Sequence, residues 1–134
     1  MKSQYKHVLL RCLLVATAIL FLAVVLGAFG AHALEEGFTS KQIANWHTAV
    51  DYMVLHAFAL IVVAFLMNIL PKQIKTWQRA GQSFLLGMIL FSGSLIAWSL
   101  TSYTPLVILT PIGGLLFLVG WAILFVGILR VYRD

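Results

Sequence analysis

The chain has 134 residues, of which 62% are hydrophobic and 10% are charged, and its formal net charge is +5. Soluble proteins carry about 25% charged residues, so this composition excludes an ordinary soluble domain and indicates a protein embedded in lipid. The positive charge does not indicate a nucleic-acid partner, because the basic residues flank long apolar runs, where topology and anionic lipid headgroups account for them.

Four apolar runs are long enough to cross a membrane, at about residues 12–33, 48–70, 80–101 and 106–129. A helix crosses a hydrocarbon core of about 30 Å with about 20 residues. Four such helices use almost the whole chain, so the sequence predicts an all-α protein with a single transmembrane domain over residues 1–134. The first run exceeds the roughly 7 to 15 apolar residues of a signal peptide, and we expect a retained helix.

The limits of the second helix can be predicted from its flanking residues. Thr39 is followed three residues later by Gln42, which is the spacing of a capping box, so this helix is expected to begin near Ser40. Pro71 is expected to end it. A helix from Ser40 to the residue before Pro71 measures about 45 Å, which is longer than the hydrocarbon core is thick. Its start, at about residues 40–50, is therefore predicted to lie at the outer interface.

The basic residues predict the orientation of the protein in its membrane. Eight of the nine lie before the first run, between the second and third, or after the fourth, which an even number of crossings places on one side. An excess of Lys and Arg in short loops marks the cytoplasmic side. The sequence therefore predicts a multi-pass membrane protein with both termini in the cytoplasm. The eight residues are Lys2, Lys6, Arg11, Lys72, Lys75, Arg79, Arg130 and Arg133.

Most tryptophans and tyrosines near the ends of the runs are placed as a membrane aromatic belt requires. Trp121 is an exception, since it falls inside the fourth run and needs a packing partner. The predicted belt residues are Trp46, Trp98 and Tyr103 at the outer boundary and Trp77 and Tyr132 at the inner one.

Small residues recur every seven positions in three of the four runs, and this pattern indicates how the helices meet. Such stripes let helix backbones approach closely, which is how helices associate in lipid, so the sequence predicts an up-down-up-down, left-handed four-helix bundle. The alternative is that one stripe faces another subunit. The glycines predicted to pack between helices are Gly27, Gly30, Gly87, Gly93, Gly113, Gly114, Gly120 and Gly127.

The residues capable of chemistry gather in the outer half of the molecule. At 100° per residue, His47 and Asp51 share one side of their helix, while Tyr52 and His56 lie on nearly the opposite side. His47 and Asp51, joined by His32 from the first helix, are weak candidates for a metal site. An interfacial His–Asp hydrogen bond is the more ordinary interpretation, and the sequence predicts no metal, haem or other cofactor.

His56 lies deeper in the membrane than Asp51, where a charged group costs several kcal/mol. One interpretation is a neutral imidazole that ties helices together, with Tyr52, a serine of the third helix or Thr110 as its partner. The other is a proton or substrate relay. A relay needs further ionisable groups along its path, and the next one inward is Lys72 at the cytoplasmic end.

Five ordered motifs resemble a family of small bacterial inner-membrane proteins of unknown function that includes YgdD-like and YwdK-like proteins. They are Gly-Ala-Phe-Gly-Ala-His at 27–32, Asp51-Tyr52 followed by His56, Phe-Ser-Gly-Ser-Leu at 91–95, Thr-Pro-Ile-Gly-Gly at 110–114, and Gly120-Trp121. The resemblance implies a four-helix membrane protein, with no established activity or cofactor. It groups eight residues as one candidate polar cluster in the outer half: His32, Asp51, Tyr52, His56, Ser92, Ser94, Thr110 and Pro111.

This cluster is predicted to surround Pro111, whose missing N–H leaves the carbonyl of Val107 without its helical partner. Gly113 and Gly114 are predicted to permit close approach of the first helix. We expect a structural clasp first, and a shallow binding site second.

Two functions remain open from the sequence. The first is an interaction protein, an accessory subunit or homo-oligomer that meets membrane lipids and a membrane-protein partner. The alternative is an oligomeric channel or transporter whose polar path is lined by His56 and the serines. Metal or haem binding is a second alternative. No credible nucleophile and base share one geometry, so an enzyme is not predicted.

Overall fold

The structure is a computed structural model, which describes residues 2–32 and 36–133. Its helices are α1 (Lys2–His32), α2 (Ser40–Ile69), α3 (Ile74–Thr101) and α4 (Leu109–Arg133), with the short 3₁₀ helices η1 (Pro71–Gln73) and η2 (Thr104–Ile108). Each long helix is apolar and long enough to span a membrane. The predicted all-α membrane fold is therefore confirmed. Residue 33, the predicted end of the first span, and Glu35 lie outside the described residues.

The predicted capping box opens α2. The backbone N–H of Thr39 donates to Gln42 Oε1 at 2.9 Å, and the backbone N–H of Gln42 donates to Thr39 Oγ1 at 3.3 Å. Two of the N–H groups that a helix start leaves unpaired are thereby satisfied. At the other end α2 stops at Ile69, two residues before Pro71. Both limits agree with the sequence prediction.

The start of α4 differs from the prediction made for Pro111. That residue is the third of α4, within the first turn, where backbone N–H groups have no intrahelical acceptor. Val107 belongs to η2 rather than α4. Its carbonyl therefore does not lose an α-helical hydrogen bond because residue 111 lacks an N–H. The predicted gap inside the helix is wrong for this reason, and Pro111 begins the helix rather than interrupting it.

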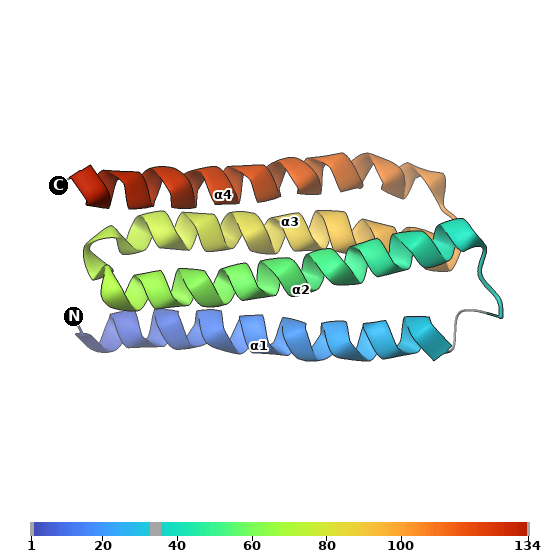
Figure 1. Cartoon of the computed structure of the whole chain (residues 1–134), viewed down its shortest axis with the longest axis horizontal. Coiled ribbons are helices and arrows are strands. Elements are labelled where there is room, and N and C mark those ends of the chain that lie inside the picture. The colour runs from blue at the N-terminus through green and yellow to red at the C-terminus, as the bar shows by residue number, and fades with distance from the viewer. Residues whose placement is uncertain (1, 33–35, 134) are drawn as a thin grey trace.

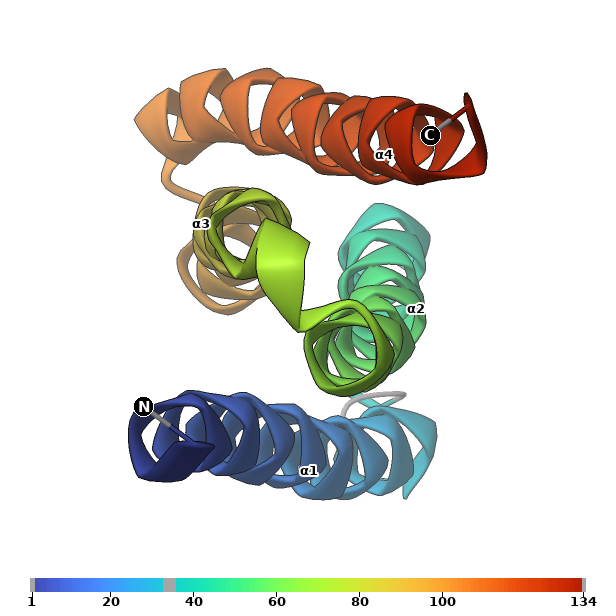
Figure 2. The same ribbon diagram turned by 90° about the vertical axis from the view of Figure 1, so that its left-hand side faces the viewer.

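Successive helices run antiparallel and form three layers. Both termini lie at the same end of the molecule as the α2–α3 connection, which we call the basic end, and the other two connections lie at the far end (Figure 1). In the end-on view, α2 and α3 form the middle layer, α1 covers one side of it and α4 covers the other (Figure 2). The α2–α3 pair therefore separates α1 from α4.

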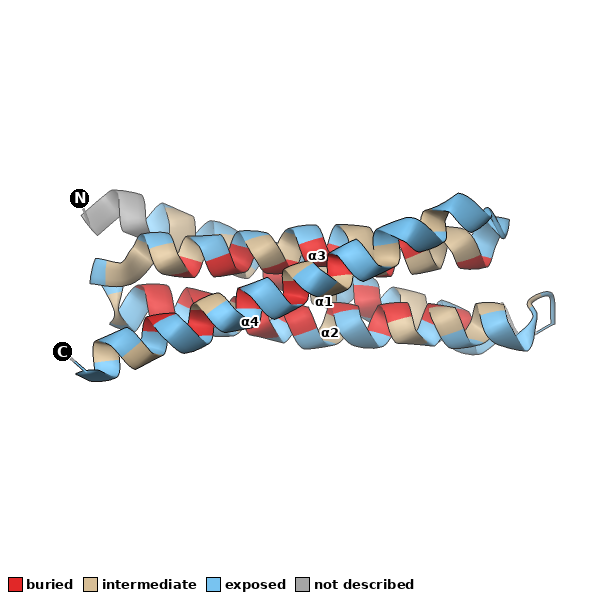
Figure 3. Ribbon diagram, turned by 90° about the horizontal axis from the view of Figure 1, so that it is seen from above, coloured by how far each residue is buried: buried red, intermediate tan, exposed pale blue. Residues whose placement is uncertain are grey.

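Buried residues follow the sides of the helices that face one another, and outward sides are exposed (Figure 3). The fraction of buried residues is largest in α2 and smallest in α1. Trp77, Phe84 and Leu60 are among the largest fully buried side chains. Exposed outer surfaces of α1 and α4 are rich in Leu, Val and Phe, as expected for contact with lipid chains.

The α3–α4 contact places aromatic rings over glycines. A Cβ added to Gly120 would lie 2.5 Å from Phe84 Cε1, and one added to Gly87 would lie 2.6 Å from Phe117 Cδ1. At Gly113 the added atom would meet the backbone nitrogen of Phe91. These contacts show why small residues recur on both helices, since any side chain there would separate them.

Two of the predicted belt tryptophans lie inside the protein instead. Trp46 is 2% exposed and Trp77 is fully buried. A Cβ added to Gly30 would lie 2.6 Å from the Trp46 ring, and one added to Gly127 would lie 2.6 Å from Trp77 Cζ3. Each glycine thus leaves room for an indole. Trp46 and Trp77 differ from the predicted belt because their rings point into these spaces rather than toward the membrane boundary.

The remaining glycines make looser contacts than predicted. Gly27 and Gly114 are at ordinary van der Waals distance from Val50 and Phe91, and nothing lies within 4 Å of a Cβ on Gly93. The expected approach of Gly113 and Gly114 to the first helix is wrong. Both contact α3, because the middle layer stands between α4 and α1.

Candidate functional site

His56 is the centre of the candidate site, since it is a polar ring buried between α2, α3 and α4 with 1% of its surface exposed. Its Nδ1 lies 2.9 Å from the backbone carbonyl oxygen of Tyr52, one turn earlier in α2. The indole Nε1–H of Trp121 in α4 donates to His56 Nε2 at 3.3 Å. The hydrogen bond from Trp121 therefore ties two helices that do not follow each other in the chain.

These two contacts determine the protonation state of the ring. An indole N–H can only donate, so His56 Nε2 must be the unprotonated acceptor. The proton is then on Nδ1, where it is donated to the Tyr52 carbonyl. Both nitrogens are satisfied only when the imidazole is neutral, since a second proton on Nε2 would point at the Trp121 donor. This geometry agrees with a neutral ring that joins helices.

Aromatic rings enclose His56 on several sides. Its ring stacks on Phe117 with centroids 3.5 Å apart and planes 8° apart, and Phe84 packs at 5.5 Å. The ring of Tyr52, 38% exposed, stacks at 5.8 Å. Stacking of this kind adds about 0.5–1.5 kcal/mol per pair beyond the burial itself. The packed rings leave His56 held in position rather than free to turn toward a passing solute.

Ser94 and Thr110 form a separate polar contact nearer the far end. Their hydroxyl oxygens lie 2.7 Å apart, and Ser94 Oγ also donates to the carbonyl of Phe91 at 2.9 Å. The pair joins α3 to the first turn of α4. Ser92 stands apart from both groups, because its hydroxyl is the buried side-chain atom without a hydrogen-bond partner among the described residues.

The structure does not bring the other predicted cluster members to His56. His32, Asp51 and Pro111 are all exposed, and Asp51 lies on the outward side of α2 beside His47, as the angular spacing predicts. Among the described residues, no three His, Cys, Asp or Glu side chains lie close enough to hold a metal ion. The His32, His47 and Asp51 combination therefore has no shared geometry.

Two contributors escaped the sequence interpretation. Trp121 was expected to need a partner but was not assigned to His56, since the two are 65 positions apart. The sequence predicts Gln42 only as a capping residue, yet its side-chain Nε2 donates to the backbone carbonyl of Ser99 at 2.9 Å. Ser99 Oγ in turn donates to the backbone carbonyl of Gln42 at 3.0 Å. The signal in the sequence is the side-chain amide of Gln42, whose oxygen accepts at the helix cap and whose NH₂ group remains free to donate elsewhere.

Taken together, the polar side chains form isolated interhelical ties rather than one continuous path. The His56–Trp121, Ser94–Thr110 and Gln42–Ser99 contacts each join two helices. Interhelical hydrogen bonds in lipid contribute about 0.6 kcal/mol on average and up to about 1.7 kcal/mol. Chemically, these sites can hold the helices in register, and they do not supply a relay of ionisable groups.

Comparison with known proteins places the chain among membrane proteins of unknown activity. Residues 26–114 match the family described as protein of unknown function (DUF423). The chain is 43% identical over 109 residues to the UPF0382 membrane protein YwdK of Bacillus subtilis, which covers 81% of this chain and 88% of that protein. It is 37% identical over 115 residues to the UPF0382 inner membrane protein YgdD of Escherichia coli, covering 85% and 86%. No solved structure matches.

Proposed function

Because the chain belongs to the DUF423 family and is a multi-pass protein of the bacterial inner membrane, we propose that it is an interaction subunit that binds another membrane protein. Its binding surface is the outward side of α2, which we call the α2 stripe. Exposed residues recur there at helical spacing of three or four: His47, Asp51, Leu55, Phe58, Val62 and Phe65.

The observation that carries this proposal is the exposure of Asp51 on α2, at a position that we infer to lie within the hydrocarbon. Phe117 lies near the middle of the predicted fourth span, and because it stacks on His56, we infer that His56 lies near mid-depth. Asp51 is five residues earlier in α2, about 7 Å along the axis, whereas the hydrocarbon extends about 15 Å from its midplane. The carboxylate thus faces outward within the hydrocarbon region.

An ionisable side chain in that position calls for a partner. Such groups cost several kcal/mol in lipid and nearly always face a protein interior, a paired group or a water-filled cavity. Asp51 has no hydrogen-bond or ion-pair partner in the part of the chain that the structure describes. The side chains next to it on the α2 stripe, Leu55 and Phe58, are more than half exposed and offer apolar contact area.

Charge favours a different protein over a second copy as the partner. Two copies in one membrane have the same orientation, so a symmetric contact through the α2 stripe would bring two Asp51 carboxylates to the same depth, where like charges repel. A helix that offers a Lys, Arg, His or hydroxyl donor at this depth would satisfy the carboxylate instead. The small-residue faces are less suited to a partner, because α1, α3 and α4 use them against one another or against α2.

The test is site-specific photocrosslinking in cells at natural expression, with a photoreactive amino acid at Leu55. The matched control has the same group at Val24, which is 70% exposed on α1 and also lies near mid-depth. We expect one adduct of fixed mass from position 55, its loss in an Asp51→Leu background, its retention in Asp51→Glu, and no such adduct from position 24.

Other outcomes would contradict the proposal. An adduct of twice the chain's own mass would indicate self-association, and equal adducts from both positions would indicate random collisions in the membrane. An adduct from position 55 that persists in Asp51→Leu would remove the carboxylate from the interaction. Native mass spectrometry of the gently extracted protein provides an independent measurement, in which a reproducible heteromeric mass is expected.

A further inference from the structure

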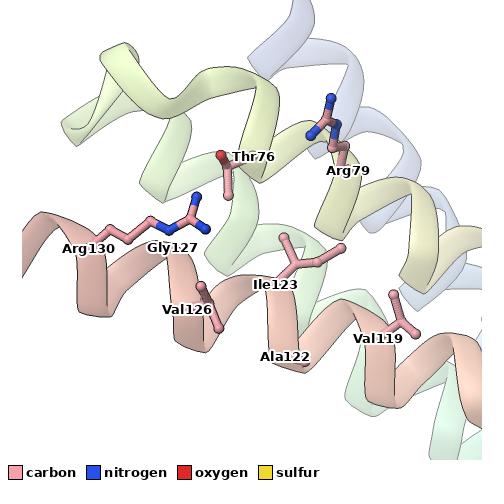
Figure 4. Close-up of a pocket in the computed structure, with 8 residues that line it drawn as sticks. All are labelled: Thr76, Arg79, Val119, Ala122, Ile123, Val126, Gly127 and Arg130. Carbon is pink, nitrogen blue, oxygen red and sulfur yellow. The ribbon is translucent and has the colours of Figure 1, made fainter.

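A groove at the basic end lies between α3 and α4, with a volume of about 400 Å³. Its rim carries two guanidinium groups and a hydroxyl: Arg79 and Thr76 from α3, and Arg130 from α4. Figure 4 shows the Arg130 side chain extending from α4 toward Thr76, whereas the Arg79 side chain leaves α3 on the side away from α4. Below this rim the walls are apolar, and Val119 and Ile123 are among them.

The depth of the groove corresponds to one leaflet of a membrane. Val119 is two residues from Phe117 and therefore about 3 Å from mid-depth, while Arg130 is thirteen residues from Phe117, or about 20 Å. The hydrocarbon of one leaflet is about 15 Å thick, so Val119 lies near its inner limit and Arg130 lies at headgroup level. The groove thus leads from the headgroups to the middle of the membrane.

Arg79 occupies an unusual depth for a cation. It is eight residues from Gly87, which meets Phe117, so its Cα lies about 12 Å from mid-depth, just inside the hydrocarbon. An arginine at this position extends its guanidinium toward the headgroup level, where phosphate oxygens are available. The acidic residues that the structure describes, Glu36 and Asp51, lie toward the far end or outward on α2, away from this groove.

We propose that this groove binds one anionic phospholipid of the leaflet at the basic end. The phosphate is held by Arg130 and Thr76, which lie side by side at the rim, and by Arg79 once its long side chain turns toward them. One acyl chain lies on Val119 and Ile123. Charge-assisted hydrogen bonds from guanidinium to phosphate give the headgroup contact, and the apolar walls replace contacts among lipid chains. The geometry selects a phosphate that carries an acyl chain rather than free phosphate, because the apolar part of the groove lies beneath the charged rim.

The proposal is tested by native mass spectrometry of the purified full-length protein in detergent, with added phosphatidylglycerol as the probe. Phosphatidylcholine and inorganic phosphate are added in parallel samples. Three variants are compared with the unmodified protein. Arg79→Gln/Arg130→Gln removes both rim charges, Lys72→Gln/Lys75→Gln removes the same charge from exposed residues outside the groove, and Ala122→Trp fills an exposed position of the groove wall without changing charge.

We expect the protein to retain one phosphatidylglycerol per chain in preference to phosphatidylcholine. The double arginine variant should lower its apparent affinity by about tenfold to thirtyfold, as expected for two lost phosphate contacts. Ala122→Trp should also reduce retention, whereas the double lysine variant should stay within about threefold of the unmodified protein. Since Ala122 is exposed, that variant tests the site without disturbing the core.

Several results would overturn the proposal. Equal retention of phosphatidylcholine would show that charge does not select the lipid, and equal loss in the two double variants would reduce the effect to the general positive field. Undiminished retention by the double arginine variant or by Ala122→Trp would place the lipid elsewhere. Binding of inorganic phosphate that competes with phosphatidylglycerol would identify a free-anion site instead of a lipid site.

Discussion

The ring-over-glycine contacts between α3 and α4 predict a graded response to single methyl groups. We consider the Gly→Ala substitutions at positions 113, 120 and 93. At Gly113 the new Cβ would meet the backbone nitrogen of Phe91 and lie 2.8 Å from the carbonyl oxygen of Gly87. Both atoms belong to the α3 backbone, which cannot yield without moving α3 and α4 apart.

The expected magnitudes follow from what each methyl group meets. Overpacking costs about 1–3 kcal/mol, and an alanine in a helix recovers up to about 1 kcal/mol relative to glycine. Gly113→Ala should therefore lower the free energy of unfolding by about 2 kcal/mol. Gly120→Ala, whose Cβ would meet the fully buried ring of Phe84 at 2.5 Å, should cost about 1–2 kcal/mol. Gly93→Ala meets nothing within 4 Å and should be neutral or slightly stabilising.

The assay is reversible unfolding of the purified protein in mixed micelles, monitored by tryptophan fluorescence and circular dichroism. Gly93→Ala is the matched control, because it makes the same chemical change in α3 at a position where the added methyl group meets nothing within 4 Å. Equal stability of the three variants would refute the packing argument, as would an order in which Gly93→Ala is the least stable.

Three further results are expected from the polar contacts and from the basic residues. In a double-mutant cycle of His56→Phe and Trp121→Phe, thermal unfolding should reveal a coupling of about 0.6–1.7 kcal/mol, and a coupling near zero would contradict the proposed tie. Ser92→Ala should be neutral or stabilising, because it removes a buried hydroxyl without a partner among the described residues, whereas Ser99→Ala should cost about 1 kcal/mol through its bond to α2. Reporter fusions after the C-terminal residue should indicate the cytoplasm, and periplasmic activity of the reporter would reverse the orientation predicted from the basic residues.

Local features of the fold were predictable because the signals that specify them are local. The capping box at Thr39 and the stop before Pro71 involve residues three or four positions apart, and both are found as predicted. Heptad spacing likewise marks the close-packed sides of α3 and α4. Angular spacing correctly placed His47 and Asp51 on a different side of α2 from His56, since helix geometry alone determines that separation.

The pairing of helices was not predictable from the same signals. A stripe of small residues indicates that another helix approaches closely, but it does not identify that helix. Gly113 was assigned to the first helix from this signal, and it contacts α3 instead. Position near a membrane boundary similarly does not determine whether an indole points to lipid or inward. Trp46 turns inward because Gly30 leaves space and the Leu26 carbonyl accepts its N–H at 2.9 Å.

The candidate polar cluster joined residues by motif and depth, and the structure separates them by direction. His56 and Asp51 lie on one helix within two turns, yet the first is buried with both ring nitrogens satisfied and the second is exposed. Their chemistry follows from this difference. A satisfied neutral ring contributes to stability and has no free nitrogen to offer a solute, whereas an outward carboxylate contributes little to the isolated chain and stays available for the partner that we propose. Two residues five positions apart on one helix therefore differ in role: His56 joins helices, and Asp51 is the residue that we propose for association.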